Sequence, residues 1–181
     1  LLLSSAASDV YKRQLYDRLS PFEMVKYFAD LNSMDKSVFD KRCKDIFDRL
    51  DMNTFANKRI GTLSSGMKQK TSIARTIIHD PDIIVFDEPT TGLDVMTSRS
   101  IIELIRNSKN ENKTIIFSSH RMEEVQSLAD DIGVIYNGKL IFNGTKSDFE
   151  SLSDLASYDD TLINLIDNSW ILFYQSSKKS L

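Results

Sequence analysis

The chain has 181 residues, of which 41% are hydrophobic and 27% are charged, and its net charge is −3. This length suits one domain or most of one, and the composition is that of an ordinary globular protein. The weakly acidic balance offers no basic field for nucleic acid, so we expect no nucleic-acid partner. Cys43 is the single cysteine, which rules out an intramolecular disulfide framework. No apolar run approaches the ~20 residues that span a bilayer, so any membrane association is expected to come through a partner.

The first 14 residues are expected to lie outside the fold. The basic pair Lys12-Arg13 follows the apolar start, which reverses the order found in a signal peptide. The stretch Val10–Gln14 resembles a translated sequencing adapter joined to an incomplete gene. We therefore interpret residues 1–14 as a non-native leader.

Helical patterns dominate residues 15–62, which are predicted to form a small helical subdomain. Ser20-Pro21-Phe22-Glu23 is a capping box with proline at the first helical position, and apolar residues follow it at helical spacing. A second helix is predicted from about Lys36 to Leu50, with its charges on a solvated face.

Strands and helices alternate over residues 63–148, which are predicted to form part of a catalytic core. A helix from about Ser65 to Ile78 precedes Ile83–Phe86, an apolar run typical of a strand buried on both faces. A helix over 95–108, a strand over 114–118 and a short helix over 122–129 follow. This order predicts the α/β class, with a mostly parallel sheet and flanking helices. Asn137-Gly138 indicates a hairpin between strands 132–136 and 140–142, and residues 149–181 are predicted to be a C-terminal tail.

Two adjacent carboxylates, Asp87 and Glu88, directly follow the apolar strand. Ligand sites in parallel sheets lie beyond the carboxyl ends of the strands. Asp87 would hold Mg²⁺, directly or through water, because this ion prefers oxygen ligands and keeps waters. Glu88 would orient and polarise a water molecule for attack on a γ-phosphate. The alternative is that the two acids only begin a solvent-exposed loop.

Further segments could contribute to a phosphate site. Leu63–Lys70 begins a helix with small hydroxyl residues and a glycine, whose backbone N–H groups could bind an anion, or it is an ordinary serine cap. Gly92 could supply a positive φ in a turn, and Asp94 could cap the following helix. His120, at the end of a strand, could donate to a phosphate oxygen, although a plain loop histidine is the default interpretation.

The order and spacing of these segments resemble the catalytic half of an ATPase of the ATP-binding-cassette (ABC) transporter family. The motifs that carry the resemblance are the signature motif at Leu63–Gln69, Walker B with its catalytic glutamate at Ile83–Glu88, the D-loop at Gly92-Leu93-Asp94 and the switch histidine at His120. Leu15–Leu19 resembles the start of the helical subdomain in the sodium-export and drug-export branch. The resemblance covers about Leu15–Gly144 and implies the C-terminal part of a P-loop ABC ATPase domain.

This resemblance implies an ATP site shared by two subunits. Ser64 and Gly66 would touch the γ-phosphate of ATP held by a second nucleotide-binding subunit, and Ser65 and Asp94 are grouped with them as nucleotide-binding residues. The acids Asp87 and Glu88 and the switch histidine, His120, would act on ATP held in their own subunit. The implied cofactors are ATP and Mg²⁺. The implied partner is a transmembrane permease subunit, and the location is peripheral, on the cytoplasmic face of the cell membrane.

The sequence departs from the family pattern at the phosphate-binding loop and in the signature. It contains no G-x-x-x-x-G-K-[ST], and Gly61–Lys68 has Met67 where such a loop needs lysine. The family places this loop upstream, so the chain resembles an N-terminally truncated ATPase, itself expected to be inactive while its parent hydrolyses ATP. Ser65 and Met67 also replace the commonest Gly and Gln of the signature, and Met cannot hydrogen-bond as Gln does.

Two other functions stay open. One is a soluble ABC-type ATPase that acts on chromosomes or ribosomes, although such proteins usually carry long coiled coils, a second cassette or basic arms, and the sequence shows none of these. The other is a non-catalytic interaction module whose signature helix completes a partner's site in trans.

Overall fold

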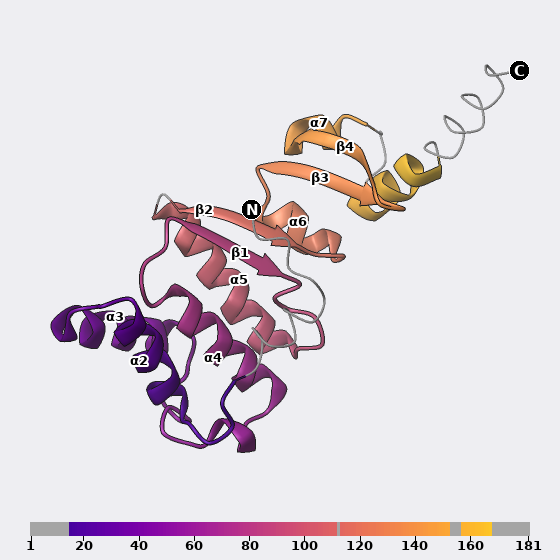
Figure 1. Ribbon diagram of the computed structural model, residues 1–181. Coiled ribbons are helices and arrows are strands. Elements are labelled where there is room, and N and C mark those ends of the chain that lie inside the picture. The colour runs from indigo at the N-terminus through magenta and orange to yellow at the C-terminus, as the bar shows by residue number, and fades with distance from the viewer. Residues whose placement is uncertain (1–14, 112, 153–156, 168–181) are drawn as a thin grey trace, which may run out of the picture. The chain divides into compact units, whose positions relative to one another are not determined.

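A computed structural model describes residues 15–111, 113–152 and 157–167. The chain divides into two compact units, with the boundary between Ser118 and Ser119, and each unit is described by itself (Figure 1). The expected leader, residues 1–14, lies outside the described residues, as does much of the expected tail. The predicted boundaries of the helical subdomain, core and tail stay predictions.

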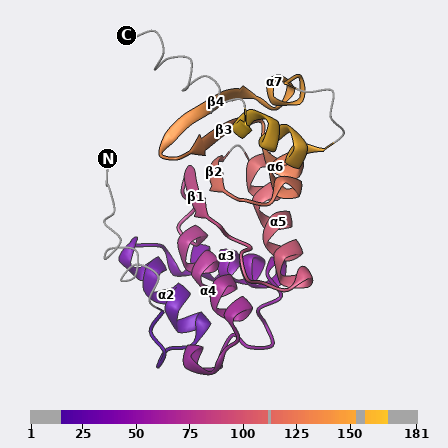
Figure 2. The same ribbon diagram turned by 90° about the vertical axis from the view of Figure 1, so that its right-hand side faces the viewer.

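The first unit begins with helices α2 (Pro21–Leu31) and α3 (Lys36–Arg49), followed by α4 (Ser65–Ile77). The predicted capping box is confirmed, because Ser20 Oγ accepts from Glu23 N at 3.2 Å and Ser20 N donates to Glu23 Oε2 at 2.8 Å. Figure 2 shows α2 and α3 beside α4. Their apolar faces form a core whose buried members include Met24, Val25, Ala29, Phe39, Ile46, Phe47, Ile73 and Ala74.

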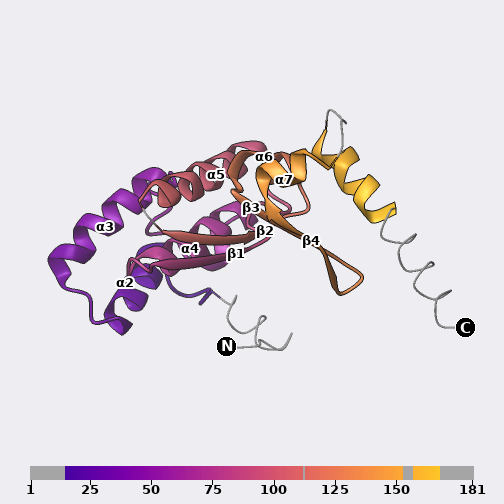
Figure 3. The same cartoon turned by 90° about the horizontal axis from the view of Figure 1, so that it is seen from above.

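The sheet of the first unit is a parallel pair, as predicted. β1 (Ile83–Asp87) lies in register with β2 (Thr114–Ser118), so that Asp87 is opposite Ser118. Helix α5 (Val95–Asn110) connects the two strands, and α4 and α5 lie on the same side of the pair (Figures 1 and 3).

The prediction that β1 is buried on both faces is wrong. Ile84 and Phe86 are buried, whereas Ile83 is 62% and Val85 65% exposed. Side chains alternate between the two faces of a strand, and α4 and α5 pack against only one of them. Ile116 of β2 is also exposed, so one apolar face of the described pair is uncovered.

The second unit contains α6 (Met122–Leu128) and an antiparallel hairpin of β3 (Asp131–Tyr136) and β4 (Lys139–Thr145). The predicted turn is confirmed: Asn137 and Gly138 have φ values of 49° and 73°, the positive values that a tight hairpin turn needs. Helix α7 (Lys146–Glu150), which was not predicted, follows, and residues 158–167 are also helical. Ile132, Phe149 and Tyr158 form the core of this unit. Among the described helices of both units, none has the length and hydropathy that crossing a membrane requires.

Candidate nucleotide site

The predicted catalytic acids lie where β1 ends beside β2. Ser118 Oγ donates to Asp87 Oδ1 at 2.9 Å and accepts from Glu88 N at 2.9 Å. The parallel register causes this arrangement, because it sets Asp87 opposite Ser118. A single hydroxyl therefore orients the carboxylate of one acid and the backbone of the next.

Glu88 has a left-handed backbone, with φ of 47°. A non-glycine residue in this region is uncommon and costs about 1–3 kcal/mol, so the surrounding contacts must hold it. Besides the bond to Ser118, Thr91 Oγ1 donates to Glu88 Oε2 at 2.7 Å and Thr91 N donates to Glu88 O at 3.3 Å. The side chain and the backbone of Glu88 are thus both directed by residues of the same turn and of β2.

The predicted signature segment starts helix α4. Ser64 is the N-cap, and its Oγ accepts from Met67 N at 3.3 Å. Ser64 and Ser65 are exposed, whereas Gly66 is buried. Gln69, one turn later, donates from Nε2 to the carbonyl oxygen of Pro89 at 3.2 Å. The helix that carries the two serines is therefore tied directly to the loop that follows the two acids.

Asp94 caps helix α5, as predicted. Its Oδ1 accepts from Thr97 N at 2.9 Å and its Oδ2 accepts from Thr97 Oγ1 at 2.8 Å. These backbone and side-chain hydrogen bonds hold the pKa of Asp94 below its ordinary value. Gly92, in the preceding turn, has φ of 73°, which fulfils the expected positive φ. The capping role of Asp94 is confirmed, and its nucleotide-binding role stays a prediction.

His120 belongs to the second unit and is exposed. The segment around it is held by Glu124, a buried carboxylate on α6. Glu124 Oε2 accepts from Ser119 Oγ at 2.9 Å, and Glu124 Oε1 pairs with Arg121 Nη1 at 3.0 Å. Since Glu88 lies in the first unit, the expected joint action of His120 and Glu88 stays a prediction.

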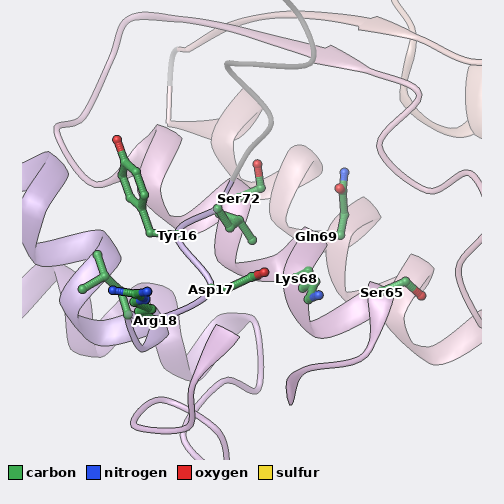
Figure 4. Close-up of a pocket in the computed structure, with 9 residues that line it drawn as sticks. Tyr16, Asp17, Arg18, Ser65, Lys68, Gln69 and Ser72 are labelled. Carbon is green, nitrogen blue, oxygen red and sulfur yellow. The ribbon is translucent and has the colours of Figure 1, made fainter. Parts of the chain in front are cut away.

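A pocket of 1020 Å³ lies in the first unit between residues 15–19 and α4. Its walls include Tyr16, Asp17 and Arg18 on one side and Ser65, Lys68, Gln69 and Ser72 of α4 on the other (Figure 4). Ser65 is the predicted site residue that borders this pocket. Asp87 and Glu88 do not line it, so the pocket and the pair of acids are separate features of the unit.

The donor set at the acids fits a magnesium ion that arrives with a nucleotide. Within the described residues, no three or more His, Cys, Asp or Glu side chains cluster so that they could hold a metal. Mg²⁺ commonly uses one or two carboxylates and takes its other ligands from water and substrate phosphates. Asp87, already oriented by Ser118, would be such a carboxylate.

Sequence reasoning missed the residues that hold these side chains in place. They are Gln69, Thr91, Thr97 and Ser118. Ser118 had a usable signal, because it ends a predicted strand that pairs in parallel with the strand ending in the acids. Thr97 also had one, since it stands at the third helical position after a predicted aspartate cap. Gln69 lies inside the predicted signature segment, but its bond to Pro89 had no local signal, and Thr91 had none beyond being polar.

Comparisons with known proteins agree with these motifs. A family model described as "ABC transporter" matches residues 6–91, a range that begins inside the expected leader. The ABC transporter ATP-binding protein NatA of Bacillus subtilis is 47% identical over 146 residues, which cover 81% of this chain and 58% of that protein. The linearmycin resistance ATP-binding protein LnrL of Bacillus subtilis is 32% identical over 83% of this chain and 47% of its own length. The lantibiotic transport ATP-binding protein SrtF of Streptococcus pyogenes is 31% identical over 84% of this chain and 65% of its own length.

A solved structure described as an ATP-binding subunit of an ABC transporter aligns with a TM-score of 0.76. The alignment covers 84% of this chain and 65% of that chain, and at 23% identity it supports the fold alone. The chain therefore spans about half to two thirds of the length of each of these four proteins. Together with the motif order, these matches show that the chain belongs to the ABC transporter ATP-binding family.

Proposed function

We propose that the chain supplies the hydrolytic acids and the signature helix of an ATPase subunit that powers export through a separate membrane subunit. Proteins of this family bind ATP and are generally ATPases, and the relatives include proteins named for resistance and for transport. The observation that carries the proposal is the pair Asp87 and Glu88 at the end of β1, with both residues bonded to Ser118.

In this proposal, Glu88 is the general base and Asp87 the residue that holds Mg²⁺ through water. A bound Mg²⁺ would neutralise charge on the β- and γ-phosphate oxygens. The carboxylate of Glu88 would polarise the attacking water. The hydrogen bonds from Glu88 N to Ser118 and from Thr91 to the Glu88 carboxylate hold the residue in its left-handed conformation and fix the direction of its side chain. The role of His120 as a hydrogen-bond donor to the γ-phosphate is proposed from the family resemblance alone, because His120 belongs to the second unit.

The start of α4 serves a different nucleotide in this proposal. Ser64 and Ser65 are exposed at the helix N-terminus, where N–H groups and the helix dipole favour an anion. With Gly66 and Asp94 they would bind ATP held by a second nucleotide-binding subunit, identical or different. ATP would close the two subunits together and hydrolysis would release them. This cycle would move a transmembrane permease, to which the ATPase subunits would bind peripherally at the cytoplasmic face of the membrane.

The test uses the full-length protein that carries this segment, purified with its permease. We expect Glu88→Gln to lower the ATPase rate by about 10²–10⁴-fold, the usual contribution of a general base, while ATP binding persists. Glu103→Gln is the matched control, because Glu103 is an exposed glutamate that pairs along α5 with Arg99. An unchanged rate for Glu88→Gln would overturn the assignment of the base.

The 181-residue chain by itself is proposed to have weak or no ATPase activity. None of its residues form a G-x-x-x-x-G-K-[ST] loop, whose backbone amides and lysine hold the phosphates in P-loop proteins. Assay of this chain with MgATP therefore gives no more than background hydrolysis. A measurable rate that Glu88→Gln abolishes would contradict this expectation.

A further inference from the structure

One side chain of α5 contacts both the signature segment and the D-loop segment. Thr97 donates its backbone N–H to Asp94 Oδ1 at 2.9 Å and its hydroxyl to Asp94 Oδ2 at 2.8 Å. Both carboxylate oxygens of Asp94 are thus engaged by the same residue. The orientation of this carboxylate therefore depends on where Thr97 lies.

The same side chain touches the start of α4. A Cβ atom placed on Gly66 would lie 3.2 Å from Thr97 Cγ2 and 3.2 Å from Thr97 Oγ1, closer than ordinary van der Waals contact. The glycines with positive φ among the described residues are Gly92 and Gly138, so Gly66 keeps an ordinary helical backbone. Glycine in a helix costs about 1 kcal/mol relative to alanine. The close approach of Thr97, and not the backbone conformation, therefore disfavours a larger residue at position 66.

We infer that Thr97 is a positioning residue that sets the spacing between Gly66 and Asp94. This inference rests on the proposed function, in which both segments face a nucleotide held by the partner subunit. Both branches of the Thr97 side chain approach Gly66, and the hydroxyl also donates to Asp94. Any displacement of the start of α4 is consequently passed to the carboxylate of Asp94, so that the two segments move together.

The packing step is tested in the 181-residue chain by urea unfolding. Gly66→Ala should lower the midpoint in the wild-type background, because the new Cβ collides with Thr97. In the Thr97→Ala background, Gly66→Ala should raise the midpoint. The Cβ of residue 97, which remains there, would lie 3.6 Å from the new Cβ of residue 66, an ordinary contact, and alanine is a better helix former than glycine. Ser65→Ala, at the exposed neighbouring position, is the control and should change the urea midpoint by the same amount in both backgrounds. A Gly66→Ala shift of the same sign and size in both backgrounds would overturn the inferred contact.

The functional step is tested in the full-length ATPase by separating kcat from KM. Thr97→Val keeps the shape and removes the hydroxyl, and we expect the KM for ATP to rise about tenfold with little change in kcat, since Gly66 and Asp94 are proposed to bind the nucleotide. Thr97→Ser keeps the hydroxyl bond and should retain the wild-type KM. A general loss of structure would instead reduce the number of active molecules, which lowers the apparent kcat and leaves KM unchanged.

The outcomes separate the two proposals. If the wild-type protein hydrolyses ATP, Glu88→Gln abolishes hydrolysis and Thr97→Val matches the wild type, then the proposed function stands and the role of Thr97 is refuted. If the wild-type protein hydrolyses no ATP, the proposed function fails and the inferred role of Thr97 fails with it.

Discussion

Replacing Ser118 by alanine removes the group that joins β2 to both acids. The hydroxyl makes one hydrogen bond to the carboxylate of Asp87 and one to the backbone of Glu88, each at 2.9 Å. A hydrogen bond contributes about 0.5–1.5 kcal/mol net to stability. Because Ser118 and Asp87 are exposed, we expect the two hydrogen bonds of Ser118 to contribute near the lower end of this range. We therefore expect Ser118→Ala to lower the free energy of unfolding by about 1–2 kcal/mol, or Tm by about 2–8 °C.

Urea unfolding of the 181-residue chain measures this change, with Ser118→Thr as the matched control that keeps the hydroxyl. Hydrogen exchange at the amide of Glu88 supplies a local readout, because this N–H loses its acceptor only in the alanine variant. Faster exchange of Glu88 in Ser118→Ala than in Ser118→Thr is the expected result. Equal midpoints and equal exchange in the two variants would refute the role of the hydroxyl.

Further expectations concern the thiol, a turn glycine and acid stability. Burial, and secondarily Asp40, raise the pKa of Cys43 to about 11, so at neutral pH the folded thiol should react with a disulfide reagent about a hundredfold more slowly than in the urea-unfolded chain. Gly138→Ala should cost about 1–2 kcal/mol in urea unfolding because φ is 73°, whereas Gly133→Ala, whose Cβ would meet Leu140 at an ordinary 3.6 Å, should cost little. The cap hydrogen bonds hold the pKa of Asp94 below 3.8, so the stability that they contribute is present above that pH and is lost as the pH falls through the lowered pKa. Melting curves from pH 6 to about pH 3 should therefore show a decline in Tm, and this decline should be smaller in Asp94→Asn.

Local patterns were sufficient to predict most of the described elements. The capping box at Ser20 and the Asn137-Gly138 turn each depend on residues next to one another, and both are confirmed. The position of Asp87 and Glu88 at a strand end followed from the apolar run before them, because such runs form buried parallel strands. Helix α7 was missed because it is only 5 residues long, too short for a periodic pattern.

Features that depend on packing between distant segments could not be predicted. The exposure of Val85 is one case. An apolar run indicates that both faces of a strand can be buried, but it does not indicate which elements cover each face. The contact of Gly66 with Thr97 is another, because it requires the starts of α4 and α5 to meet across 31 positions of the sequence. Ser118 is an intermediate case, because its place at the end of a predicted strand was a usable signal, whereas its pairing with Asp87 depends on the strand register.

The structure also explains how methionine is accommodated at position 67 of the signature. The contacts of this residue within the helix use its backbone: Met67 N donates to Ser64 Oγ at 3.3 Å, and Met67 O accepts from Thr71 Oγ1 at 2.8 Å. Neither bond depends on the side chain, so replacing the commonest glutamine leaves the cap and the first turn of α4 intact. Gly66 is different, because a Cβ atom there would lie only 3.2 Å from two side-chain atoms of Thr97. The local fold therefore constrains position 66 of the signature through sterics, whereas the two hydrogen bonds at position 67 come from the backbone.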